Sequence, residues 1–235
     1  MSHGVTVVSA SLVKMSACIA VLACVVLGSC AEDEAGYDPY YNWAARNEAW
    51  YMQKVDSARS AIAEAKAKYG EDWESHCEWR MFKSLLRSQS FNSGNVMDSI
   101  CVRVRESGVR SENTLSPLYA DTVRLSYRGF LMPAEYMDDN GAIATSQKVF
   151  SQTFYGNYDA AIAAPTLLKV SGTVEGFSTA LQYMVPGDVW DVYIPQALAY
   201  GGSTSNSDIP AYSTLLFRIY LTAVYRAGSG VPEWK

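Results

Sequence analysis

Apolar and polar positions divide the chain into a helical first part and an extended second part. Between Asn42 and Tyr69 the apolar residues are spaced alternately four and three apart, which places them on one face of a helix. This stripe consists of Tyr51, Val55, Ala58, Ile62, Ala65 and Tyr69. Gly70 follows as a C-cap. We expect the stripe to pack either on its own domain or, as a weak coiled-coil seam, on a second copy of the chain.

Farther along, the apolar residues recur with a period of two. Val123, Leu125 and Tyr127 alternate with polar residues, as in a half-buried strand. Further strands are predicted at 100–104, 189–194 and 215–224, and the polar, turn-rich segment 133–146 is predicted to be a surface insertion. Residues 79–82 fit the start of either a strand or a second short helix.

One short helix is predicted among these strands, from Glu175 to Met184. Its apolar residues Phe177, Ala180, Leu181 and Met184 share one face, which must pack on something flat. One helix on an antiparallel sheet is an α+β arrangement. We therefore predict a helical N-terminal extension over 42–98 and a sheet domain over 99–228.

The N-terminus carries a targeting signal. Met15–Leu27 is an apolar run of 13 residues behind Lys14, too short to cross a bilayer core of about 30 Å as a helix. It fits the h-region of a signal peptide. The sequence Leu27-Gly28-Ser29-Cys30 resembles the bacterial lipobox. The resemblance implies cleavage before Cys30 and lipid attachment at its sulfur, with residues 1–29 as the signal peptide and 30–41 as a tether.

An acidic cluster, Glu32-Asp33-Glu34, follows Cys30 almost directly. It is either a solvated part of the tether or, by resemblance, the surface-export signal of Bacteroidetes lipoproteins. These features predict an outer-membrane lipoprotein of the cell envelope, held to the membrane through Cys30. Its domain would face either the periplasm or the cell surface.

Charge and histidine content exclude several classes of function. The net charge is −5, or −6 once residues 1–29 are removed, and no basic stripe exists, so the chain is a poor nucleic-acid binder. The two histidines, His3 and His76, leave little room for a histidine-dependent nucleophile or a His-rich metal site. Outside the predicted signal peptide and Cys30, Cys77 and Cys101 are either a disulfide or two free thiols.

Seven motifs follow one another over residues 123–217. They are Val123 to Gly129, Phe150, Val174 to Phe177, Met184 to Gly187, Ile194 to Gly201 (Ile-Pro-Gln-Ala-Leu-Ala-Tyr-Gly), Ile209-Pro210 and Thr214 to Phe217. In this order they resemble the FKBP-type peptidyl-prolyl cis-trans isomerases. The resemblance implies an antiparallel sheet wrapped around one short helix. It also implies an isomerase that needs no cofactor or metal, binds proline-containing peptide segments and assists the folding of exported proteins.

The resemblance also implies a role for each residue of a peptide-binding pocket. Tyr127, Phe150 and Phe217 would form its walls, Phe177 its floor and Val174 its entrance, while the Tyr200 hydroxyl and the Ile209 backbone N–H would bind the substrate carbonyl. Prolyl isomerisation breaks no bond, although its barrier is about 18–20 kcal/mol. The scarcity of histidine is therefore expected for such an enzyme.

The chain departs from the family pattern at several points. Ser151 replaces an acidic residue, Phe177 replaces tryptophan, and Asp208 places a charge beside the pocket mouth, where the family is usually apolar. By position, Ser151 and Asp208 are still expected to contact the substrate, together with Phe150 and Val174. The connection 156–165 is longer than usual and is expected to cover the pocket. Three functions thus stay open. They are an active isomerase, an FKBP-like module that binds a peptide or a partner lipoprotein without catalysis, and a general chaperone in which the 42–69 helix supplies dimerisation or substrate grip.

Overall fold

The computed structural model describes residues 37–87, 94–138, 140–203 and 208–233. Residues from Pro39 onward form one unit, and Met1–Asp38 fall in another. The predicted signal peptide, the acidic cluster and Cys30 lie outside the described ranges. Within these ranges, no helix has the length and apolar character needed to cross a membrane.

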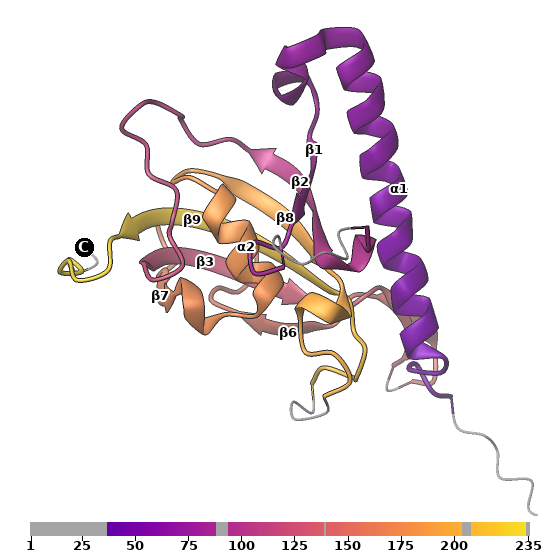
Figure 1. The fold of residues 1–235 in the computed structure, drawn as a ribbon. Coiled ribbons are helices and arrows are strands. Elements are labelled where there is room, and N and C mark those ends of the chain that lie inside the picture. The colour runs from indigo at the N-terminus through magenta and orange to yellow at the C-terminus, as the bar shows by residue number, and fades with distance from the viewer. Residues whose placement is uncertain (1–36, 88–93, 139, 204–207, 234–235) are drawn as a thin grey trace, which may run out of the picture. The chain divides into compact units, whose positions relative to one another are not determined.

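An antiparallel sheet of seven strands forms the centre of the fold (Figure 1). Its strand order is β1-β2-β8-β9-β3-β6, and β7 also pairs with β3. The strands are β1 (Trp79–Lys83), β2 (Ser99–Glu106), β3 (Thr122–Phe130), β6 (Val149–Gln152), β7 (Thr166–Lys169), β8 (Val189–Ile194) and β9 (Leu215–Tyr225). The three predicted strands after residue 120 and the one at 100–104 are confirmed.

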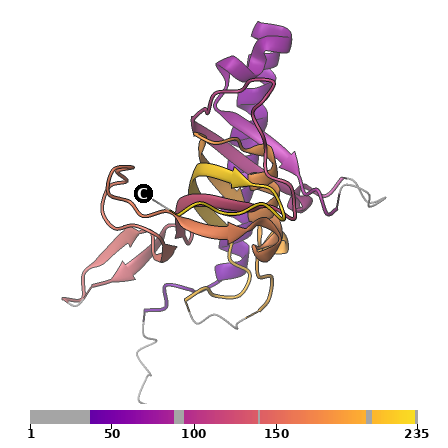
Figure 2. The same ribbon diagram turned by 90° about the vertical axis from the view of Figure 1, so that its left-hand side faces the viewer.

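The predicted surface insertion is a hairpin of its own. β4 (Ala134–Met137) pairs with β5 (Ile143–Ser146) in a separate two-stranded sheet. Figure 2 shows this hairpin projecting away from the main sheet.

One face of the sheet carries the predicted short helix, α2 (Glu175–Tyr183). Its apolar residues Phe177, Ala180 and Leu181 are buried, as is Met184 directly after it. Gly176 lets the helix approach the sheet, because a Cβ at this position would lie 2.3 Å from Cγ2 of Ile194. The α+β fold, an antiparallel sheet wrapped around one short helix, is confirmed.

The long helix α1 (Trp43–Tyr69) packs on the opposite face of the sheet. Tyr51, Val55 and Ala58 are fully buried there in a cluster that includes Cys101 of β2 and Tyr193 of β8. The Tyr51 hydroxyl donates to the Ser99 carbonyl at 2.6 Å. The stripe therefore packs on its own domain, the first of the two alternatives for it.

Both ends of α1 are fixed by specific contacts. Near its start, Trp43 Nε1 donates to Ser213 Oγ at 2.8 Å, and Asn47 Oδ1 accepts from the Thr214 backbone N–H at 2.9 Å. At its end, Gly70 has a φ of 59° and donates its N–H to the Lys66 carbonyl, which confirms the predicted C-cap. Contacts with residues just before β9 thus tie the N-terminal extension to the sheet domain.

Residues 79–83 form a strand, which settles the ambiguity in the sequence. The 3₁₀ helix η1 (Gly70–His76) leads from α1 into β1, and β1 pairs along its length with β2. The sheet therefore continues across the predicted boundary at residue 98. The other 3₁₀ helices are η2 (Val96–Asp98), η3 (Val170–Gly172) and η4 (Gln196–Leu198).

Cys77 and Cys101 are free thiols, the second of the two alternatives for them, and no disulfide joins them. The Cys101 thiol is buried beneath α1 and donates to the Lys54 carbonyl at 3.4 Å. Burial raises the pKa of Cys101 to about 12. Cys77 is partly exposed beside η1.

Candidate active site

A cavity of about 490 Å³ lies between the N-terminal end of α2 and the sheet. It is lined by Tyr127, Phe150, Ser151, Leu168, Gly172, Thr173, Val174, Phe177, Tyr200, Ile209 and Phe217. Every residue predicted for the pocket except Asp208 is among them. None of the lining side chains carries a formal charge, so the cavity offers an apolar, aromatic surface with a few hydroxyl groups.

Aromatic rings at near right angles form the walls and floor of the cavity. The Phe177 and Phe217 ring centroids are 4.9 Å apart at an interplanar angle of 87°, and those of Phe150 and Phe217 are 5.4 Å apart at the same angle. Tyr127 lies 6.0 Å from Phe177. Such edge-to-face pairs are favourable beyond the area they bury. They hold the rings in place around the cavity.

Gly129 makes this ring arrangement compatible with β3. It pairs with Ser151 on one side and with Phe217 on the other. A Cβ at Gly129 would lie 2.7 Å from the Phe150 ring and 2.8 Å from the Phe217 ring. The glycine therefore lets both rings cross close to the strand.

A network of charged groups fixes the end of α2 that bears Phe177. Glu175, in the first turn of α2, accepts from Arg87 Nε at 2.8 Å and from Ser84 Oγ at 2.5 Å. Arg87 also donates to Asp98 at 2.7 Å and to the Ala197 carbonyl of η4 at 2.7 Å. Hydrogen bonds to Glu175 and Asp98 raise the pKa of the Arg87 guanidinium. Residues before β2 thus hold both α2 and the turn that leads to Tyr200.

Hydroxyl groups line part of the cavity. Tyr200 is 42% exposed, which leaves its ring accessible to a bound peptide. The Tyr127 hydroxyl lies 2.8 Å from Ser151 Oγ, within hydrogen-bond distance. Ser151 therefore contacts a neighbouring pocket residue even though it replaces an acidic side chain. Ile209 is 3% exposed, so it contributes a buried part of the lining.

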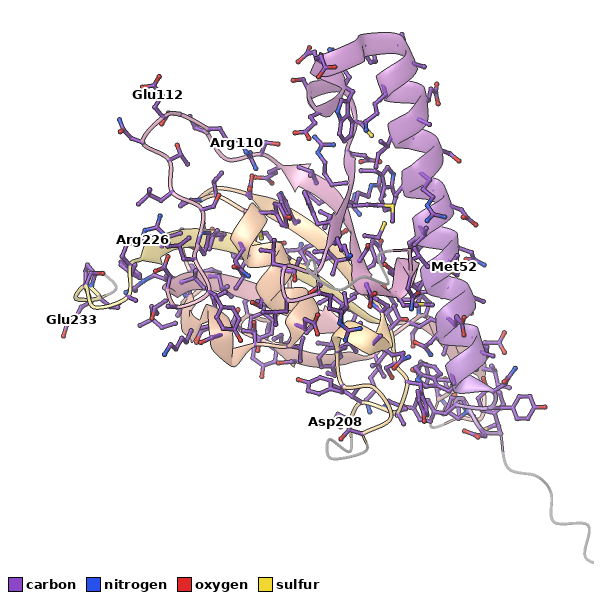
Figure 3. All side chains as sticks on the ribbon, viewed as in Figure 1. Met52, Arg110, Glu112, Asp208, Arg226 and Glu233 are labelled. Atoms are coloured by element: carbon purple, nitrogen blue, oxygen red, sulfur yellow. The ribbon has the colours of Figure 1, made fainter. Side chains whose placement is uncertain are left out.

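Asp208 lies outside the cavity lining, although it was predicted to contact the substrate. Its side chain is 61% exposed and one carboxylate oxygen lies 3.7 Å from Lys148 Nζ. Figure 3 shows Asp208 on a loop at the periphery of the molecule. Its charge is thus directed toward solvent and Lys148.

The connection 156–165 does not cover the cavity, contrary to expectation. None of its residues lines it. Tyr158 instead stacks on Tyr220 at 3.7 Å, and Phe154 packs edge-on against both rings. Because Tyr220 lies on β9 between the core residues Ile219 and Leu221, it points to the face of the sheet opposite α2.

Leu168, Gly172 and Thr173 line the cavity but were not predicted to do so. Leu168 lies on β7, Gly172 ends η3 and Thr173 follows it. Leu168 reaches the site because β7 pairs with β3. The only sequence signal for Gly172 and Thr173 is their position directly before Val174, and Leu168 has none. Strand pairing decides their place, and local pattern does not reveal it.

The comparison with protein families matches this part of the chain. Residues 116–222 fit the family described as FKBP-type peptidyl-prolyl cis-trans isomerase, and this range includes every residue that lines the cavity. Residues 116–222 thus match an FKBP-type domain.

Curated relatives align with the FKBP-type domain. An outer membrane protein MIP of Legionella longbeachae is 30% identical over 111 residues, which cover 47% of this chain and 40% of that protein. The FKBP-type 22 kDa peptidyl-prolyl cis-trans isomerase of Escherichia coli K12 is 30% identical over 108 residues, or 46% of this chain and 43% of that protein. The chain spans less than half the length of these relatives.

Solved structures give more distant similarities. The crystal structure of FkpA from Escherichia coli superimposes with a TM-score of 0.43 at 21% identity and covers 80% of this chain and 70% of that one. A peptidyl-prolyl cis-trans isomerase from Pseudomonas syringae pv. tomato has a TM-score of 0.41 at 21% identity, and the match covers 74% of this chain and 96% of that one.

Proposed function

We propose that the chain is a peptidyl-prolyl cis-trans isomerase that acts on proline-containing segments of exported proteins at the cell envelope. One observation carries the proposal: an uncharged cavity walled by Tyr127, Phe150, Phe177 and Phe217, with Tyr200 accessible at its side. The cavity lies within the region that matches the isomerase family. The roles of the individual residues are part of this proposal.

The chemistry that such a cavity supplies is the stabilisation of a twisted amide. Resonance makes the planar prolyl amide strongly dipolar, and water stabilises that dipole. An apolar cavity favours the twisted form, in which the resonance is lost, over the planar one. Phe177 would support the proline ring from below, and Tyr200 and the Ile209 N–H would bind the carbonyl. No proton or covalent intermediate is needed.

The test is a direct measurement of prolyl isomerisation. The chain from Ala31 onward, which contains the whole unit that begins at Pro39, would be mixed with a short Xaa-Pro-Phe peptide. We expect isomerisation faster than the uncatalysed rate in proportion to protein concentration. A folded protein that leaves the rate unchanged would overturn the proposal.

A second function, peptide binding without catalysis, is favoured by Ser151 and Phe177. At Ser151 a hydroxyl replaces the acidic side chain of the family pattern, and at Phe177 a phenyl ring replaces the indole. Titration calorimetry with the same peptide separates the two functions. Binding without any acceleration of isomerisation would support the binding module.

Membrane attachment through a lipidated Cys30 is part of the proposal. The lipobox supports it, and one relative is named as an outer membrane protein. The face of the outer membrane at which the domain lies, periplasmic or external, is testable by protease shaving of whole cells. Digestion of the domain in intact cells would indicate the external face.

A homodimer through the 42–69 helix is the remaining proposal on partners. The buried residues Tyr51, Val55 and Ala58 are engaged by the chain's own sheet, so a dimer would use the outward faces of α1. Sedimentation equilibrium of the chain from Ala31 onward tests it. A single species of monomer mass at high concentration would exclude the dimer.

A further inference from the structure

The first strand of the sheet has a free edge. β1 is the terminal strand and pairs only with β2. The Val104 N–H donates to the Glu78 carbonyl at 2.7 Å, and the Ser84 N–H donates to the Asp98 carbonyl at 2.8 Å. Hydrogen-bonded and non-hydrogen-bonded residue pairs alternate in an antiparallel ladder. The backbone N–H and C=O groups of the even-numbered residues 78 to 84 therefore point toward β2. Met81 and Lys83 therefore direct their N–H and C=O groups away from the sheet.

These outward groups are available for pairing. At Trp79 the N–H lies 3.4 Å from Cys77 Sγ and the carbonyl accepts from Arg80 Nη1 at 2.7 Å, so this residue is already engaged. Met81 and Lys83 have no such backbone partner within the ranges that the structure describes. An open edge of this kind is a template for another strand.

A groove runs along this edge. A cavity of about 420 Å³ is lined by Met81, which faces α1, and by Arg80 and Phe82, which face the other side of the sheet. A cavity bounded by side chains from both faces of an edge strand must lie at the edge itself. Its far wall is the later half of α1, and Figure 1 shows β1 between β2 and that part of the helix. A strand laid against β1 would occupy this groove.

A second cavity, of about 570 Å³, adjoins the groove on the α2 side of β1. The two share Glu74, Arg80 and Phe82 in their linings. Phe82 stacks on Tyr183 at 4.1 Å and lies 5.7 Å from Trp190, so this cavity has an aromatic wall. Since successive side chains of a strand point to opposite faces, an added strand would send alternate side chains into the two cavities.

The charges around the groove are mainly positive. Arg59, Lys66 and Arg80 line it, against the single carboxylate of Glu74. Lys66 Nζ and the Arg80 guanidinium lie 4.9 and 4.7 Å from the Trp73 ring centre. Among the placed residues, no carboxylate lies within ion-pair distance of Arg59 or Lys66. Arg110, which pairs with the buried Asp188 at 2.9 Å, also lines the second cavity, and Figure 3 shows it on the far side of the fold from Asp208.

We propose that β1 binds an extended peptide segment with alternating apolar and acidic side chains, as an added strand of the sheet. Main-chain hydrogen bonds to Met81 and Lys83 hold the segment. Its apolar residues meet Phe82 and Tyr183, and its acidic residues meet Arg59 and Lys66. The peptide is a stretch of an incompletely folded protein. This site is formed largely by residues before 116 and is separate from the cavity beside Phe177.

The test uses the chain from Ala31 onward and a fluorescein-labelled peptide of about eight residues, a common strand length, in which valine alternates with glutamate and proline is absent. Fluorescence anisotropy at low salt should show saturable binding. Met81→Pro removes the outward N–H without breaking a bond to β2, and edge strands tolerate proline. It should weaken binding about tenfold, the loss expected for one main-chain hydrogen bond.

A matched pair of charge reversals tests the ionic part. Lys66→Glu should weaken binding about fivefold, whereas Lys68→Glu, two residues farther along the same helix and outside the groove lining, should leave it unchanged. Equal effects of the two would overturn the assignment of the acidic side chains to this groove. Circular dichroism of each variant verifies folding.

A peptide methylated at alternate backbone nitrogens tests strand pairing without altering the protein. Loss of binding on methylation is expected, and unchanged binding would overturn the proposal, as would the absence of binding by the unaltered chain.

Phe177→Ala should leave binding intact. If it abolished binding while Met81→Pro did not, the peptide would lie in the aromatic cavity instead. Self-association that Met81→Pro removes, without peptide binding, would identify a second copy of the chain as the occupant.

Discussion

Phe177 and Tyr200 illustrate how two residues of one cavity differ in their physical situation. Phe177 is 3% exposed and packs against Tyr127 and Phe217, so it belongs both to the core and to the cavity. Tyr200 also lines the cavity but is 42% exposed. Substitutions at the two positions should therefore affect stability very differently.

Tyr200→Phe should lower kcat/KM for prolyl isomerisation about tenfold, because it removes one hydrogen bond to the substrate carbonyl. The unfolding midpoint should not change. Phe177→Ala should lower kcat/KM more and also destabilise the fold by about 3–5 kcal/mol, the usual cost of emptying a buried phenyl site. Isomerisation assays with chemical unfolding curves measure both effects. Full activity of Phe177→Ala in a folded protein would exclude its role as the pocket floor.

The two thiols should differ in reactivity because the thiolate is the reacting species. Burial raises the pKa of Cys101 to about 12, so almost no thiolate forms there at pH 8, and Cys77 is partly exposed. In the chain from Ala31 onward, a chromogenic thiol reagent at pH 8 should modify Cys77 rapidly and Cys101 only after denaturation. Cys77→Ser should remove the rapid phase. Rapid reaction of both thiols in the native protein would contradict the burial of Cys101.

At the scale of elements, Arg87 joins segments that are distant in sequence. It connects Asp98 before β2, Glu175 at the start of α2 and Ala197 in η4. These last two elements carry Phe177 and lead to Tyr200. The geometry of the cavity therefore depends on a residue outside the family-matching range 116–222.

Arg87→Ala should lower kcat/KM about tenfold by releasing the end of α2 from its position. Arg103→Ala is the control, since Arg103 pairs with Glu78 away from the cavity. Arg87→Lys should retain part of the activity, because lysine keeps the positive charge but cannot make all the hydrogen bonds of the guanidinium. Steady-state kinetics and thermal unfolding of all three variants separate a local effect from global destabilisation. Equal losses for Arg87→Ala and Arg103→Ala would argue against a positioning role.

Sequence periodicity anticipates elements better than it anticipates their partners. The four-and-three spacing over Tyr51 to Tyr69 predicts α1, and the alternation around Val123 predicts β3, because side-chain direction follows from local backbone geometry. The ordered motifs also anticipate eight residues of the cavity lining. The prediction that residues 156–165 cover the pocket was wrong. Their position depends on the stacking of Tyr158 on Tyr220, a contact that no local sequence pattern reveals. Leu168 was missed for the same reason, since pairing with β3 places it.

At the scale of the whole molecule, the sheet domain depends on the N-terminal extension. α1 covers Cys101 and Tyr193 on one face, and β1 completes the pairing of β2. The family-matching range contains neither element. Removing the extension would expose apolar surface and a further strand edge, both of which promote aggregation.

The proposed anchor is tested on the intact chain in cells. Cys30→Ser should move the protein from the membrane fraction to the soluble envelope fraction, because the acyl chains supply the hydrophobic attachment. Cys77→Ser is the control and should stay with the membrane. Fractionation followed by immunoblotting provides the measurement. Unchanged membrane association of Cys30→Ser would count against lipidation at this residue.

The place of β9 in the sheet has a consequence for biosynthesis. β9 is the last strand along the chain, yet it lies between β8 and β3 near the middle of the sheet. Until β9 emerges from the ribosome, β3 has no partner strand on the side that β9 will occupy. Pairing across such long sequence separations is also slow. A nascent chain with the predicted export signal would therefore stay unfolded throughout translation. That is the state in which a polypeptide can be threaded through a translocation channel.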